Sequence, residues 1–143
     1  MDKLSRSLED YLESIYIISL DKKIARVKDI VNRLGVKSSS VIGAIKKLVA
    51  GGYVEHEHYG HIELTKEGRK RAVRLYDRHT TLTKFFHEIL HVDKKIAEED
   101  ACRVEHELSE ESYSRIIKLL AHIISLSETD PKCFNELKKS VND

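Results

Sequence analysis

The chain has 143 residues and a nearly balanced charge, with 25 Lys and Arg residues against 24 Asp and Glu residues. Because 41% of the residues are hydrophobic and the net charge is only +1, disorder throughout the chain is excluded. No stretch approaches the roughly 18 uninterrupted apolar residues of a membrane-spanning helix. The N-terminus lacks the apolar core of a secretory signal, and two cysteines make no disulfide framework. These features predict a soluble, cytoplasmic protein of one domain or of two small ones.

The distribution of charge and of turn-forming residues narrows the class further. Residues 1–75 carry 15 basic and 10 acidic side chains, whereas residues 76–143 carry 10 basic and 14 acidic ones. A basic first half joined to an acidic second half suggests a nucleic-acid-binding module with a second function attached. The chain has one proline and six glycines, so its long periodic stretches predict a mainly α fold.

The first 64 residues show three helical segments followed by a hairpin. Ser7 and Asp10 resemble a helix-capping pair, and apolar residues then recur at helical spacing as far as Ile18. Gly35 and the pair Gly51-Gly52 are typical of helix ends. We therefore expect helices over residues 8–18, 27–34 and from 38 or 39 to 49, and short strands over 53–58 and 61–64 around a glycine turn.

The remaining residues indicate helices only. Residues of helix-capping type precede each periodic stretch, and a proline stands in the first turn of the last one. The expected helices run from Thr65 to about Leu90, from Asp93 to about Leu108, from Ser109 to about Leu126, and from Asp130-Pro131 onward.

The order helix, helix, turn, helix and hairpin is that of a winged helix-turn-helix, in which the third helix enters the major groove and the hairpin wing lies along the DNA backbone. Serine hydroxyls and free N–H groups at the start of that helix suit phosphate contacts, although the serines could also simply cap it. Gly43 falls where a long polar side chain would be useful, so specificity is expected to depend on its neighbours and on DNA shape. The predicted DNA-binding residues are Lys37, Ser38, Ser39, Ser40, Lys46 and Lys47.

A set of carboxylate, imidazole and thiolate side chains would suit a first-row divalent transition metal. Two carboxylates share one face of the first helix, one histidine interrupts an apolar stripe of the long helix, and three further donors share a face of the next helix. Each also has a structural explanation, as a cap, a core histidine or ordinary surface residues, and spacing alone does not show that these faces converge. The candidates are Asp10, Glu13, His79, Cys102, Glu105 and His106.

Longer motifs resemble those of a known family and thereby imply that these faces converge. Residues 100–109, DACRVEHELS, closely resemble the signature of the diphtheria-toxin-repressor and manganese-transport-regulator family of metal-dependent repressors, as do Leu64–Gly68 and Arg78-His79. The similarity covers nearly the whole chain, and the length matches the short two-domain members that lack an SH3-like domain. The resemblance implies metal ligands at Asp10, Glu13, His79, Glu105 and His106, with Cys102 at the remaining ligand position.

Cys102 makes the implied metal ambiguous. Iron-responsive members have cysteine at this position and methionine in the first helix, whereas manganese-responsive members have acidic residues at both. A thiolate favours softer metals than Mn²⁺, but Asp10 and Glu13 supply hard oxygens. The resemblance therefore implies Fe²⁺ or Mn²⁺, with Co²⁺ or Zn²⁺ able to bind in vitro. Thr83 and Glu98 stand at two positions of the ancillary site of longer members. The resemblance therefore implies one metal site or a compact two-metal cluster here, and not that ancillary site.

Two further features have simpler explanations. His56, His58 and His61 lie in the predicted hairpin, where phosphate contacts are favoured over a surface metal site. Cys133 is expected to be a small buried hydrophobe.

The sequence thus predicts a mainly α homodimeric repressor that controls metal uptake. Residues 1–75 would bind an inverted-repeat operator in double-stranded DNA, and residues 76–143 would bind metal and dimerise. The metal would tie the two domains together in the separation that the operator needs. Two alternatives stay open: a winged-helix regulator responding to redox through Cys102 or to a small molecule, and a di-metal helical enzyme. Only fragments of a Glu-x-x-His pattern appear, so no enzyme is expected.

Overall fold

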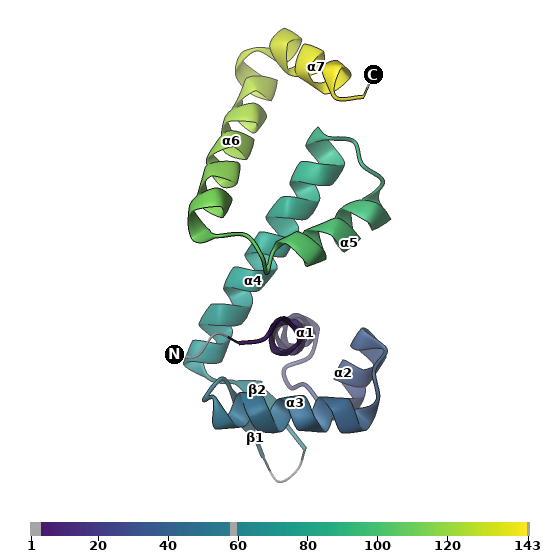
Figure 1. Ribbon diagram of the computed structural model, residues 1–143, viewed down its shortest axis with the longest axis vertical. Coiled ribbons are helices and arrows are strands. Elements are labelled where there is room, and N and C mark those ends of the chain that lie inside the picture. The colour runs from purple at the N-terminus through teal and green to yellow at the C-terminus, as the bar shows by residue number, and fades with distance from the viewer. Residues whose placement is uncertain (1–3, 58–59, 143) are drawn as a thin grey trace. The chain divides into compact units, whose positions relative to one another are not determined.

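The computed structural model describes residues 4–57 and 60–142 (Figure 1). The chain divides into two compact units, Met1–Tyr76 and Asp77–Asp143, called the first and second unit below. The described elements of the first unit are helices and one two-stranded antiparallel sheet, and those of the second unit are helical. This arrangement confirms the predicted fold class, a winged helix-turn-helix that a long helix joins to a helical domain.

Three helices form the body of the first unit: α1 (Arg6–Asp21), α2 (Val27–Leu34) and α3 (Ser38–Ala50). Their inward faces pack into one apolar core, in which Leu12, Ile30 and Leu48 are inaccessible to solvent. The cap of α1 differs from the prediction, because the Ser5 hydroxyl, and not Ser7, accepts the N–H of Leu8 at 3.4 Å. The helix therefore starts earlier than expected.

Glycine and a short hairpin complete this unit. Gly35 ends α2 at a φ of 65°, a left-handed conformation that favours glycine. Strand β1 (Val54–His56) pairs antiparallel with β2 (Ile62–Leu64), with Val54 opposite Leu64. The N–H of Ile62 also donates to the carbonyl of Ala25 at 2.9 Å, which ties the wing to the segment between α1 and α2. Both strands are shorter than predicted.

Helix α4 (Lys66–Lys84) begins directly on the hairpin and carries the chain from the first unit into the second. Thr65 caps it, since the Thr65 hydroxyl accepts the N–H of Gly68 at 3.0 Å and donates to the carbonyl of Gly52 at 2.7 Å. A Cβ at position 68 would lie 1.8 Å from the carbonyl oxygen of Tyr53. Only glycine permits this close approach, so the Thr65–Gly68 motif positions the start of α4.

The second unit contains the end of α4, a π-helical segment η1 (Phe85–Ile89), α5 (Lys94–Val104), α6 (Glu110–Thr129) and α7 (Pro131–Ser140). The predicted caps Asp93, Ser109 and Asp130 are confirmed, because each side chain accepts backbone N–H groups of the helix that it starts. Two predicted ends were wrong: the long helix changes to π-helical turns at Phe85 instead of continuing to Leu90, and α5 ends at Val104 instead of Leu108.

The second unit has an apolar cluster between its later helices. Ile89, Leu120 and Ile123 are the buried members of this cluster, with Phe85 and Phe134 among the residues packed against them. Further apolar residues of the unit are buried as well, namely Leu82, Ala97 and Ala101. Large apolar side chains of α5 and α6 remain exposed, namely Ile96, Ile117, Leu119 and Ile124. Within the described residues, no helix is long and apolar enough to cross a membrane.

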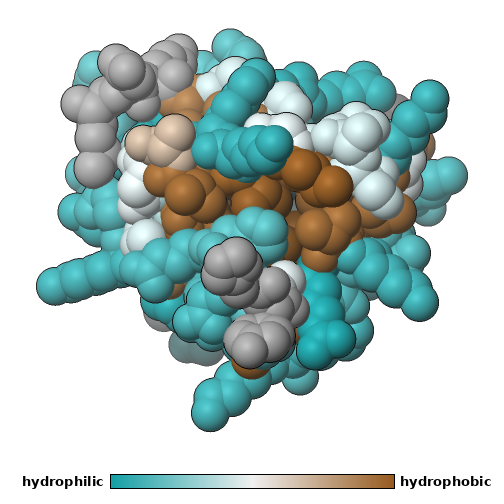
Figure 2. All heavy atoms as spheres, turned by 90° about the horizontal axis from the view of Figure 1, so that it is seen from below, coloured by the Kyte–Doolittle hydropathy of each residue, from teal (hydrophilic) through white to brown (hydrophobic). Residues whose placement is uncertain are grey.

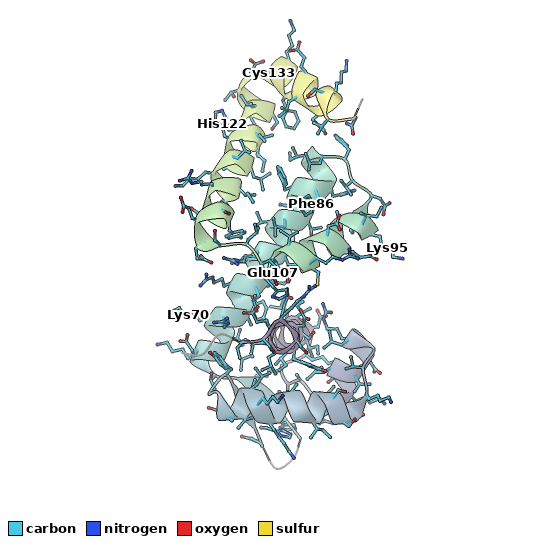
Figure 3. All side chains as sticks on the ribbon, in the orientation of Figure 1. Lys70, Phe86, Lys95, Glu107, His122 and Cys133 are labelled. Atoms are coloured by element: carbon cyan, nitrogen blue, oxygen red, sulfur yellow. The ribbon has the colours of Figure 1, made fainter. Side chains whose placement is uncertain are left out.

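The prediction that Cys133 is buried was wrong. Cys133 lies in the first turn of α7 and is exposed (Figure 3). The Asp130 side chain caps this turn by accepting the N–H of Cys133, and the apolar contacts of α7 are made instead by Phe134 and Leu137.

Candidate metal centre and DNA-binding surface

Glu105 is the centre of a polar cluster in the second unit. It lies in the turn that follows α5, beside Glu107, which Figure 3 labels. Its side chain is 0% exposed, and its Oε2 lies 2.8 Å from Nδ1 of His79 in α4. Its Oε1 lies 3.2 Å from Nε2 of His106, whose side chain is 2% exposed. The structure thus brings together three of the predicted ligands, although His79 lies 26 positions before Glu105 in the chain.

The two imidazoles control the charge of this carboxyl group. Burial of Glu105 alone would raise its pKa, but His106 and His79 outweigh burial and hold the pKa below its ordinary value. Glu105 is therefore an ionised, buried carboxylate. Such a group is costly unless positive charge lies beside it.

Cys102 lies one helical turn before Glu105, on the last turns of α5, and is half-buried. The backbone stays helical through Glu105, whose N–H donates to the carbonyl of Ala101 at 2.9 Å. Residues three and four apart on a helix share a face. Cys102 therefore lies on the same face of this segment as Glu105 and His106.

The remaining predicted ligands, Asp10 and Glu13, belong to α1 of the first unit. They are one helical turn apart, and Asp10 is half-buried whereas Glu13 is buried. The six candidates are thus divided between two carboxylates on α1 and a mixed set of imidazole, carboxylate and thiolate in the second unit.

The chemistry of the second-unit donors fits a divalent transition metal. Two imidazoles and a carboxylate are ligands of first-row divalent ions, and a nearby thiolate extends the set toward softer ones. Because Glu105 is ionised and inaccessible to solvent, a cation beside it would compensate its buried charge. The wing histidines show no comparable grouping: His56 is exposed, His61 is half-buried, and His58 lies outside the described residues.

Arg78 is a functional candidate that the sequence interpretation missed. In the sequence, Arg78 serves only as part of the Arg78-His79 motif of the family resemblance. In the structure it is 6% exposed, and its guanidinium group donates to the carbonyl of Glu105 at 3.0 Å. Its position on the buried side of α4, next to the histidine in an otherwise apolar stripe, was the available signal.

Helix α3 exposes the predicted DNA-binding residues. Lys37 precedes the helix, Ser38, Ser39 and Ser40 form its first turn, and Lys46 and Lys47 lie two turns further on, all of them exposed. Helical spacing arranges the exposed face in two adjacent rows. These rows are Ser39, Ile42, Lys46 and Val49, and Ser40, Gly43, Lys47 and Ala50.

This face also carries exposed apolar side chains. Ile42 is 43% exposed and Val49 is 42% exposed, although both are large hydrophobic residues. Figure 2, which views the side of α3 and the hairpin, shows a hydrophobic group surrounded by hydrophilic side chains. The sequence interpretation did not single out Ile42, which lies one position off the buried stripe of Val41, Ile45 and Leu48.

Fold and site together define a class: a winged-helix DNA-binding protein with a helical second unit that carries metal-ligand side chains. Residues 3–62 match the family model of the iron-dependent repressor N-terminal DNA-binding domain. Residues 65–133 match that of the iron-dependent repressor metal-binding and dimerisation domain. The chain belongs to the iron-dependent repressor family, which confirms the resemblance seen in its motifs.

Individual relatives agree. The chain is 40% identical over 114 residues to an uncharacterised HTH-type transcriptional regulator of Methanocaldococcus jannaschii, covering 79% of this chain and 91% of the relative. It is 36% identical over 134 residues to the HTH-type transcriptional regulator MntR of Lysinibacillus sphaericus, covering 94% and 93% of the two chains. These relatives are transcriptional regulators, which sets aside the enzyme alternative.

Solved structures show the same fold. The crystal structure of T. acidophilum IdeR aligns with a TM-score of 0.71 at 28% identity, over 85% of this chain and 56% of that one. A manganese-dependent transcriptional repressor in complex with manganese aligns with a TM-score of 0.73 at 29% identity, over 80% and 52% of the two chains. The chain therefore spans about half the length of these two solved structures.

Proposed function

We propose that this chain is a homodimeric repressor of metal-uptake genes that Fe²⁺ or Mn²⁺ activates for operator binding. The observation that carries the proposal is the ionised, fully buried Glu105 between His79 and His106, in a chain whose first unit is a DNA-binding domain. A buried carboxylate with two imidazoles adds nothing to DNA binding by itself. It does provide a place where a divalent ion can bind and alter the protein.

We assign the second-unit ligands to His79, Cys102, Glu105 and His106 and the first-unit ligands to Asp10 and Glu13. A bound divalent ion supplies the positive charge that both sets of anionic donors require. Asp10 and Glu13 would then hold α1 to the second unit, which restricts how the DNA-binding units of a dimer are spaced. The gain in operator affinity is bounded by the ratio of the metal affinities of the DNA-binding arrangement and of the other arrangements.

The donor set leaves two physiological metals in competition. Asp10 and Glu13 favour the harder Mn²⁺. Cys102 favours later, softer ions and therefore favours Fe²⁺ over Mn²⁺. Similar proteins carry names of both kinds: one relative is called MntR and one structural neighbour IdeR. We propose that either ion activates the protein and that Co²⁺ and Zn²⁺ bind in vitro.

The exposed face of α3 supports a major-groove role. Two symmetry-related copies of α3 would bind an inverted repeat whose half-sites are separated by about one helical turn or a multiple of it. Lys46 and Lys47 would neutralise phosphates, while Lys37 and Ser38–Ser40 lie at the helix N-terminus where base edges and phosphates are reached. We propose a cytoplasmic location, which is consistent with a DNA-binding regulator.

The test is operator binding by metal-stripped protein that is retitrated with single metals. A duplex is first selected from a random library on Mn²⁺-loaded protein. Stripped protein should bind it no better than random DNA, and Mn²⁺ or Fe²⁺ (added without oxygen) should restore tight binding. Operator affinity that metal removal leaves unchanged would contradict the proposal and favour the alternative regulator that responds to redox or to a small molecule.

A further inference from the structure

The Arg78 guanidinium group connects helix α4 to the turn that carries two of the proposed ligands. Its Nη1 donates to the carbonyl oxygen of Glu105 at 3.0 Å and to that of Leu108 at 3.2 Å. Its Nη2 donates to the carboxylate of Glu110 at the start of α6. The guanidinium carbon lies 4.7 Å from the centroid of the Tyr113 ring. One side chain therefore contacts both ends of the segment between α5 and α6.

Hydrogen bonding explains why this segment needs such a partner. The last carbonyl groups of a helix have no partner within the helix, and here the chain turns directly from α5 into α6. A buried charge is expensive unless paired and hydrogen-bonded. Arg78 satisfies these carbonyl groups, and its own buried charge is paired. Its planar guanidinium group donates to two carbonyl groups and to the carboxylate of Glu110.

We propose that Arg78 is the positioning residue of the metal centre. It lies next to His79 on α4 and fixes the backbone of Glu105, whose carboxylate contacts both His79 and His106. Arg78 thereby sets the distance between a ligand on α4 and the ligands that follow α5 before any ion binds. Arg78 is not itself a ligand, and the inference rests on the proposed function in taking His79, Glu105 and His106 as ligands.

A preformed arrangement raises metal affinity because the ligands need not be ordered when the ion binds. Loss of the residues that orient ligands typically lowers metal affinity about 10–100-fold. Lysine keeps the charge of Arg78 but is a compact point charge without the planar fork. Arg78→Lys therefore separates the loss of geometry from the loss of charge.

The experiment is a Co²⁺ titration followed by the visible absorption of the bound ion. Arg78→Lys should lower Co²⁺ affinity about 10–100-fold and change the ligand-field spectrum at saturation, because the ligands adopt a different geometry. A merely structural arginine would lower the stability of the metal-free protein but leave the spectrum of the loaded protein unchanged. Wild-type affinity and spectrum in Arg78→Lys would overturn the inference.

Matched controls complete the design. Glu110→Gln removes the ion pair but leaves both carbonyl contacts, so Co²⁺ affinity should stay within about a factor of two. Arg115→Gln removes an exposed arginine–glutamate pair on α6 and should have no effect. Tyr113→Leu, which removes the ring beneath the guanidinium group, should shift the spectrum as Arg78→Lys does but less, and it keeps the inference testable if Arg78→Lys does not fold. If wild-type protein itself binds no Co²⁺, the proposed function fails, not the role of Arg78 alone.

Discussion

Glu105 carries a charge that water does not reach, and the imidazole rings of His79 and His106 lie beside it. Metal ligands must be deprotonated, and the lowered pKa of Glu105 keeps this carboxyl group ionised. Under the proposed function, a bound ion would compensate this buried charge, and replacing Glu105 by an apolar residue would remove a ligand.

Cys102 should decide between metals. Cys102→Glu replaces a soft thiolate by a hard carboxylate, so the response should shift toward Mn²⁺ and away from Co²⁺. The measurement is a pair of activation curves for operator binding, with Mn²⁺ and with Co²⁺, in wild-type and variant protein. Relative curves that do not change would show that Cys102 is not a ligand or that geometry alone selects the metal.

Asp29 should give the first unit a measurable pH dependence. The Lys22 ammonium group donates to Asp29 at 2.6 Å and lowers its pKa; slight burial opposes this, and the Arg26 N–H, which donates at 3.0 Å, lowers it further. The pKa of Asp29 is lower in the folded protein than in the unfolded chain, where it is about 4. Asp29 therefore stabilises the fold at pH values above the unfolded pKa, and this stabilisation is lost as the pH falls through the folded pKa.

Asp29→Asn should therefore lower the free energy of unfolding at pH 7 by less than about 1 kcal/mol, since the Lys22 side chain that pairs with it is 64% exposed. Wild-type and variant should converge at acid pH, below the folded pKa. Urea unfolding of both metal-free proteins at the two pH values measures this. An equal difference at both pH values would assign the effect to the amide itself.

Single residues also show what the sequence could not reveal. The residue types and their spacing singled out His79, Cys102, Glu105 and His106 as candidate ligands, because helical spacing can be read directly from the sequence. The role of Arg78 was not visible, because its partners are carbonyl groups more than 25 positions away that carry no signal in the sequence. Cys133 was expected to be buried from its residue type alone, and the cap at Asp130 instead places it on the surface.

At the scale of elements, local signals predicted most of the fold. Caps at Asp93, Ser109 and Asp130 and the end at Gly35 were predicted correctly because each depends on its own side chain or backbone conformation. The start of α1 was predicted two residues late because Ser5 and Ser7 are equivalent as caps in sequence. Packing distinguishes them, since Leu4 and Leu8 both lie against the core. The π-helical turns at Phe85–Ile89 likewise have no signal in the apolar periodicity.

Helix α3 should bind DNA with separable electrostatic and apolar contributions. Lys47→Ala should weaken binding to operator and random duplexes alike and reduce the salt slope of log K by about one unit, because one phosphate contact is lost. Salt titrations of both duplexes measure this. Ile42→Ala is the matched control on the same face: it removes no charge, so its salt slope should equal that of wild type.

A Lys47→Ala variant that loses discrimination between the duplexes but keeps its salt slope would reverse the assignment. Lys47 would then contact a base edge, and other residues would provide the phosphate contacts. Apolar side chains read the thymine methyl group in the major groove, so an effect of Ile42→Ala confined to the operator would agree with the exposed position of Ile42.

At the scale of the whole molecule, the proposed function divides its parts between the two units. The first unit holds the proposed DNA-binding helix and two carboxylates, and the second holds imidazoles, a carboxylate and a free cysteine. Sequence similarity assigns both units to one family of metal-dependent repressors. The central claim of the proposed function is that bound metal connects donors of both units and thereby permits operator binding.

The most direct measurement uses the double variant Asp10→Asn, Glu13→Gln, which leaves every second-unit donor in place. Co²⁺ absorption reports occupancy, and the fluorescence anisotropy of a labelled operator reports DNA binding in the same sample. The account predicts that the variant still binds Co²⁺, more weakly, while its operator affinity stays at the metal-free level even when the ion is bound. Metal-loaded variant that binds the operator as tightly as metal-loaded wild type would contradict the claim.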